Sequence, residues 1–335
     1  SSSTTSFGLL ADSNTFQQST SSFSGKIDIL WVVDNSGSMG PFQSKLATNF
    51  SAFMTNFVGK GYDFHMAVTT SDAYRALPAF QNNSALSRFK DGMGLAHTTG
   101  YPVIDSSTPN IVSAFTTNAS QGETGSGDER AFQSMEAALN NSLNSSFRRA
   151  DAFLAVIILS DEDDFSSTVR LEGVSPDHSY TYTNLKPVSY YEDFLSTFTN
   201  SSGALKRFSV SAVTVKDTTC LNAHKAQAPS SVMGTRYIDL ANRTGGVLSD
   251  ICAANFVDGL DQIQQGIIEL GSQFYLNRVP QVSTIKVFVD GVAISESTSN
   301  GYTYNAAANS IVFHGGSVPR AGANIVINFD PVSLL

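Results

Sequence analysis

Charged residues are scarce in this chain of 335 residues, at 15% of the sequence against about 25% in typical soluble domains. The formal net charge is −9 and no basic run occurs, which argues against nucleic acid and anionic membranes as partners. No stretch of about 20 apolar residues is present, so no transmembrane segment is predicted. Serine, threonine and asparagine replace the missing charges, a surface composition more common in exported than in cytosolic proteins.

Cysteine is almost absent, since the sequence has only Cys220 and Cys252. In an exported protein this pair predicts one disulfide that clamps the segment between them. Two free thiols in a cytosolic protein are the alternative, and His224 near Cys220 leaves a zinc site possible on paper. We expect both cysteines to lie in loops. The chain starts within a Ser/Thr run without a visible signal peptide, which indicates a mature or trimmed form.

Several common catalytic motifs are missing. The sequence has no phosphate loop, no complete Gly-x-Gly-x-x-Gly, no Gly-x-Ser-x-Gly elbow and no His-Glu-x-x-His. The acidic run at residues 161–164 lacks the glycine and the distal glutamate of a calcium-binding hand. Five scattered histidines are predicted to be surface or packing residues: His65, His97, His178, His224 and His314. We therefore predict that the protein is not an enzyme.

The most informative stretch is residues 27–39, where a short apolar run stops abruptly at Asp34. The run is β-branched and aromatic, which predicts a strand buried on both faces. Asp34, Ser36 and Ser38 alternate, so in extended chain their side chains point the same way. Three oxygens from one loop suit a hard cation such as Mg²⁺, with Mn²⁺ or Ca²⁺ as alternatives. A Ser/Gly-rich turn without a ligand is the simpler interpretation.

Strand and helix patterns alternate up to residue 274. Strands are predicted at residues 29–33, 64–70, 152–160, 208–215 and 247–248, and helices at residues 42–57, 132–143, 190–198, 237–242 and 256–274. This order predicts an α/β fold, a doubly wound and mostly parallel sheet with helices on both faces. Sites in such sheets form at the carboxyl ends of strands. Asp34 and Asp161 both follow strands, so we expect them to lie together at the edge formed by the carboxyl ends of the strands, here called the rim.

Three other regions lack the alternation. Residues 73–127 show no strong periodicity and predict an insertion with short elements, at the edge or near the metal face. After residue 274, short alternating strands and an Asp290-Gly291 hairpin signal predict a small antiparallel β domain at residues 275–335. The polar arm at residues 1–25 could join it as an extra strand.

The loop Asp34-Asn35-Ser36-Gly37-Ser38 resembles the Asp-x-Ser-x-Ser signature of von Willebrand factor A domains, of the bacterial exported type. The resemblance covers residues 26–274 and implies a Rossmann-like fold with a metal-ion-dependent adhesion site. In that family the two serines bind the metal directly, and the aspartate helps to hold it, often through water. The resemblance assigns Asp161 to the third loop of the site.

The second loop departs from the family pattern, which places a threonine just before a helix. The sequence here is Ser126-Gly127-Asp128-Glu129, and Thr124 comes too early. We expect Asp128 or Glu129 to replace the threonine, which would bind the cation more tightly and weaken its pull on an acidic ligand. Alternatively, both are ordinary acids at a helix N-terminus.

The resemblance implies an exported protein that engages a carboxylate of a protein ligand through a divalent cation. It would lie at the cell surface, be anchored to the outer membrane or be periplasmic. A structural or assembly scaffold with an enclosed or non-functional metal site is the alternative. A hydrolase that uses a metal-bound water beside Asp161 and Glu162 is a third hypothesis, although no convergent nucleophile or base is visible.

Overall fold

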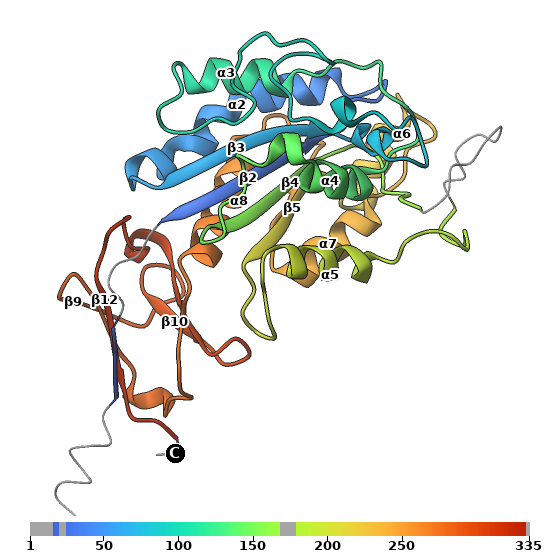
Figure 1. The fold of residues 1–335 in the computed structure, drawn as a ribbon. Helices are drawn as coiled ribbons and strands as arrows, with labels where there is room; N and C mark the ends of the chain where they lie inside the picture. Colours follow the sequence, from blue (N-terminus) through green and yellow to red (C-terminus); the bar gives the residue numbers. More distant parts are fainter. Residues whose placement is uncertain (1–15, 20–24, 168–178, 333–335) are drawn as a thin grey trace, which may run out of the picture.

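A five-stranded parallel sheet forms the centre of the molecule (Figure 1). The computed structural model describes residues 16–19, 25–167 and 179–332, so most of the predicted N-terminal arm lies outside the described residues. The strands, in the spatial order β3-β2-β4-β5-β6, are β2 (Lys26–Val33), β3 (Asp63–Thr70), β4 (Phe153–Leu159), β5 (Phe208–Thr214) and β6 (Leu248–Asp250). The chain order reverses between β2 and β4, which is where ligands bind in open α/β sheets.

Helices cover both faces of this sheet (Figure 1), so the predicted α/β class is confirmed. One face carries α2 (Gly40–Gly59), α3 (Ile111–Ala119) and α8 (Val257–Gly271), and the other carries α4 (Ala131–Asn140), α5 (Val188–Phe198) and α7 (Thr235–Thr244). Side chains of β2 alternate between these layers: Trp31 packs toward α2, whereas Leu30 and Val32 pack toward α4. Among the described residues, no helix combines the length and apolar character needed to cross a membrane.

Residues 73–127 contain a core helix that the sequence pattern did not reveal. Helix α3 packs on α2, with the ring of Phe115 stacked on Phe50 at a centroid distance of 3.7 Å. Phe115 also lies 5.3 Å from the ring of Trp31. The helix has nine residues, too few for its apolar positions to show a clear helical period.

Two predicted helix ends were wrong. Leu143, expected on the apolar face of the helix after the second loop, lies beyond the end of α4 and is 57% exposed. The final helix ends at Gly271 because Phe274 starts β7 (Phe274–Tyr275), which pairs with β11 (Ser310–Phe313).

The C-terminal region forms two small antiparallel sheets. One has the order β1-β12-β8-β9, from β1 (Phe16–Ser19), β12 (Ile325–Phe329), β8 (Lys286–Val289) and β9 (Val292–Ile294), and the other joins β10 (Tyr302–Asn305), β11 and β7. The hydroxyl of Tyr62, just before β3, donates to the Pro319 carbonyl at 2.7 Å. These accessory sheets therefore lie against the amino ends of the core strands.

The turn between β8 and β9 has the predicted hairpin chemistry, with Asp290 at φ 49° and Gly291 at φ 79°. An alanine side chain at Gly291 would be strained in this left-handed conformation, so Gly291→Ala should lower the free energy of unfolding by about 1 kcal/mol. Urea unfolding measures the change. Gly59→Ala is the control, because Gly59 is exposed at the end of α2 without a positive φ. This substitution should raise the free energy of unfolding by up to about 1 kcal/mol. Equal effects of the two substitutions would contradict the prediction.

Candidate metal centre

Asp34 organises the loop that follows β2. Its backbone N–H donates to the Leu159 carbonyl of β4 at 2.9 Å, so the loop starts where the two strands meet. Its Oδ1 accepts the N–H of Ser36 at 2.8 Å, and its Oδ2 accepts the hydroxyl of Ser160 at 2.6 Å. Both oxygens are therefore already engaged, and the carboxylate shapes the loop around the serines.

Other oxygens around this loop are buried and unsatisfied. Among the described residues, no hydrogen-bond partner exists for Ser36 Oγ, for either carboxylate oxygen of Glu129 or for Asp161 Oδ1. A buried acceptor without a partner normally costs free energy, more so when it is charged. Hydroxyl and carboxylate oxygens of this kind are the ligands that a hard divalent cation takes. The residues present therefore fit such an ion.

Asp161 comes from the loop after β4, as predicted, and is fully buried. The Ser38 hydroxyl donates to its Oδ2, which joins the first and third loops. The same oxygen lies 2.8 Å from Nε2 of His224, a residue on α6 (Thr218–Lys225). Sequence reasoning predicted a surface or packing role for His224, with a zinc site beside Cys220 as an alternative, because nothing in its own neighbourhood points to Asp161.

The structure separates the three candidates for the second loop. Glu129 is fully buried, and its backbone carbonyl accepts the N–H of Phe165 at 3.0 Å. Asp128 forms an ion pair with Nε of Arg130 at 3.0 Å, and Thr124 is exposed. Neither acid lies within the helix, since α4 begins at Ala131. Glu129 is thus the residue whose carboxylate is available at the rim.

The acids after Asp161 hold other parts of the fold. Asp164 accepts the N–H of Phe132 at 3.0 Å and so satisfies a backbone donor in the first turn of α4. Asp163 accepts the N–H of Arg236 at 3.0 Å, at the start of α7. Of the predicted negative charges in this run, Glu162 alone remains next to the candidate site, where its charge acts on Glu129.

The second loop approaches the first very closely. The N–H of Gly125 donates to the Asn35 carbonyl at 2.8 Å, and a Cβ at Gly125 would lie 2.5 Å from the Asn35 side chain, so glycine is required there. The amide of Gln43 donates to the carbonyls of Asp34 and Gly122 at 3.0 and 2.9 Å. Gln43 was missed in the sequence, although its spacing of three from Leu46 and seven from Phe50 places it on the apolar face of α2.

Acidic groups gather at this rim. Burial and the charge of Asp161 raise the pKa of Asp34 to about 7. Burial, the charge of Asp34 and the neighbouring Glu162 raise the pKa of Glu129 to about 12. Each shift means that the ionised carboxylate lacks compensation in the protein alone, and a divalent cation would supply it.

Cys220 and Cys252 form a disulfide, which confirms the predicted pairing. The expectation that both cysteines lie in loops was wrong for Cys220, which is in α6; that helix has eight residues and is capped by Asp217. The disulfide also excludes the zinc site with His224. Among the described residues, the atoms of Cys220, Asp250 and Cys252 lie within 4.8 Å of one another, but these sulfurs are not free thiolates.

No family model matches the chain. The curated proteins contain no match either. Among solved structures, the chain is similar to the pilus adhesin SpaC from Lactobacillus rhamnosus GG in its open conformation, with 12% identity and a TM-score of 0.40 over 94% of this chain and 42% of the adhesin. It is also similar to proximal thread matrix protein 1 from the mussel byssus, with 11% identity and a TM-score of 0.39 over 77% of this chain. The chain spans half of that protein's length.

Proposed function

We propose that this chain contains an exported von Willebrand factor A domain that holds a divalent cation and engages a carboxylate of a protein ligand through it. The observation that carries the proposal is the set of buried oxygens without partners on Ser36, Glu129 and Asp161, at the rim where the loops after β2 and β4 meet. The disulfide supports export, because such bonds persist in oxidising compartments.

Mg²⁺ is the first choice of cation, because hydroxyl and carboxylate oxygens are the ligands that it prefers. Ser36, Ser38, Glu129 and Asp161 would hold the ion directly, and Asp34, whose oxygens are engaged, would act through water. When bound, the ion offers a Lewis-acidic position where a ligand carboxylate can replace a water molecule. Two protein carboxylates neutralise much of its charge, which favours a moderate pull on the ligand.

A structural scaffold with an enclosed cation is the second candidate. The observation that favours it is burial, since Ser36 is 4% exposed and Glu129 and Asp161 are fully buried. A shell filled entirely by the protein would leave no position for an external carboxylate.

Calorimetric titration of Mg²⁺, Mn²⁺ and Ca²⁺ into chelator-treated protein tests the cation site. We expect the wild type to bind one ion and Asp34→Ala to bind it at least about tenfold more weakly, as for residues that act through a bound water. Absence of binding by the wild type, or equal binding by the variant, would remove the basis of the proposal.

Retention on immobilised poly-L-glutamate tests the ligand chemistry. If the site binds carboxylates, the wild-type protein should be retained on poly-L-glutamate in Mg²⁺ and released by chelator, and it should not be retained on polyglutamine. The Asp34→Ala variant should pass through the poly-L-glutamate column. A cation-loaded wild type that is not retained on poly-L-glutamate would instead support the scaffold.

A further inference from the structure

His224 touches the candidate cation site from outside it. Its Nε2 lies 2.8 Å from Asp161 Oδ2, and its side chain is 8% exposed. Because the carboxylate can only accept, the contact requires a hydrogen on Nε2. The oxygen therefore receives two donors, the imidazole and the Ser38 hydroxyl, while Oδ1 of the same carboxylate has no partner among the described residues.

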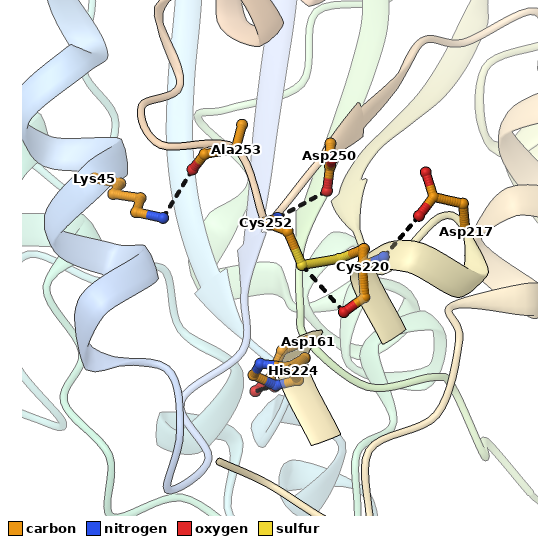
Figure 2. The surroundings of a disulfide bond; sticks show 8 residues. All are labelled: Lys45, Asp161, Asp217, Cys220, His224, Asp250, Cys252 and Ala253. Carbon is orange, nitrogen blue, oxygen red and sulfur yellow. Dashed lines mark hydrogen bonds and ion pairs between the residues drawn. A yellow bond between two sulfur atoms is a disulfide. The ribbon is translucent and has the colours of Figure 1, made fainter. Parts of the chain in front are cut away.

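The imidazole is held in position by its helix and by one neighbouring ring. Cys220 and His224 are four residues apart on α6, so their side chains share one face of the helix. The disulfide ties that face to the loop after β6 (Figure 2). The ring of Phe42, on the first turn of α2, packs edge-on against the imidazole at a centroid distance of 5.6 Å.

The loop that carries Cys252 is itself hydrogen-bonded to α2, the helix that follows the Asp34 loop. Lys45 of α2 donates to the Ala253 carbonyl at 2.8 Å, and Cys252 donates its backbone N–H to Asp250 at 2.8 Å (Figure 2). The disulfide therefore links α6 to an anchored segment, so α6 cannot move away from Asp161 without breaking several contacts.

We propose that His224 is a positioning residue of the cation site and that the Cys220–Cys252 disulfide holds it in place. By binding Oδ2, the imidazole keeps the Asp161 carboxylate turned so that Oδ1 is presented to the cation. The Ser38 hydroxyl can still donate to Oδ2 while its lone pairs bind the ion, so the two roles are compatible. The inference rests on the proposed cation site, and it adds that the Cys220–Cys252 disulfide helps to set the cation affinity of that site.

The test compares Mn²⁺ affinity, by calorimetry, in the wild type, His224→Ala, His224→Gln and the double variant Cys220→Ser/Cys252→Ser. We expect about a tenfold loss for His224→Ala, as is typical when a partner of a metal ligand is removed. The glutamine amide can still donate, so His224→Gln should recover part of the affinity. The double cysteine variant should lose affinity too, and adding His224→Ala to it should cause little further loss.

His314→Ala is the matched control, since His314 is a half-buried histidine on the accessory sheets that contacts Thr303 at 2.7 Å. It should leave Mn²⁺ affinity unchanged. Thermal unfolding in chelator verifies that each variant is folded, and electron spin echo of bound Mn²⁺ reports whether a nitrogen coordinates the ion.

The outcomes separate this inference from the proposed function. Unchanged affinity in His224→Ala, beside a weakened Asp34→Ala, overturns the positioning role and leaves the cation site intact. Nitrogen coupling in the Mn²⁺ spectrum overturns it too, because His224 would then be a direct ligand. Strictly additive losses from His224→Ala and the cysteine variant overturn the role of the disulfide. No Mn²⁺ binding by the wild type overturns both proposals.

Discussion

Replacing Glu129 by glutamine is expected to stabilise the cation-free protein and to weaken cation binding at least about a hundredfold, since it removes a direct ligand. Glu129 is fully buried without a hydrogen-bond partner among the described residues, and its pKa is raised to about 12. Without a cation, the folded protein must keep this acid protonated at neutral pH, whereas the unfolded chain ionises it. Glutamine has nearly the same shape and carries no such cost.

The expected gain in the free energy of unfolding of the cation-free protein is about 3 kcal/mol at pH 7, the cost of keeping a carboxyl with an ordinary pKa of 4.5 protonated at that pH. It should vanish near pH 4, where the carboxyl is protonated in both states. Urea unfolding in chelator measures the gain, and calorimetry with Mg²⁺ measures the loss of affinity. Glu296→Gln is the control, because Glu296 is an exposed acid between β9 and β10, and its replacement should alter neither quantity appreciably. Loss of stability in Glu129→Gln would contradict the prediction.

The cation-free protein is also expected to lose stability as the pH rises from about 4 to about 7. The pKa of Asp34 is about 7 in the folded state and near 3.8 in the unfolded chain. Over that interval the folded state binds more protons than the unfolded state, so stability falls with rising pH. Asp34 alone accounts for a decrease of about 4 kcal/mol, at 1.36 kcal/mol for each unit of pKa. Glu129 contributes a decrease of the same sign.

The measurement is urea unfolding at pH 4.5, 6 and 7.5, with chelator and with saturating Mg²⁺. Burial raises the pKa of Asp163 to about 7 as well, but Asp163 binds Arg236 away from the site, so its contribution should persist with the cation bound. The difference between the two curves therefore isolates Asp34 and Glu129. A chelated protein that is more stable at pH 7.5 than at pH 4.5 would be incompatible with this expectation.

The parts of the fold that could be predicted have local signals. The apolar runs that end at Asp34 and Asp161 predicted the two central strands, and two cysteines allow one pairing. His224 could not be predicted, because 63 residues separate it from Asp161 and only the packing of α6 brings them together. The choice between Asp128 and Glu129 depends on which of two adjacent side chains turns inward. Arg130 forms an ion pair with one of them, and no sequence pattern encodes that contact.

The arrangement of β2 has a mechanical consequence. This strand leads from the accessory sheets to the loop that carries Asp34, and it pairs in parallel along its length with β3 and β4. If a force pulls on the rim while the accessory sheets are held in place, the tension acts along the axis of β2. It therefore shears all of these backbone hydrogen bonds together, because they run between the strands rather than along them. Parallel bonds that share a force resist it far better than bonds that are peeled apart one by one. The central sheet is thus oriented to withstand tension between its two ends.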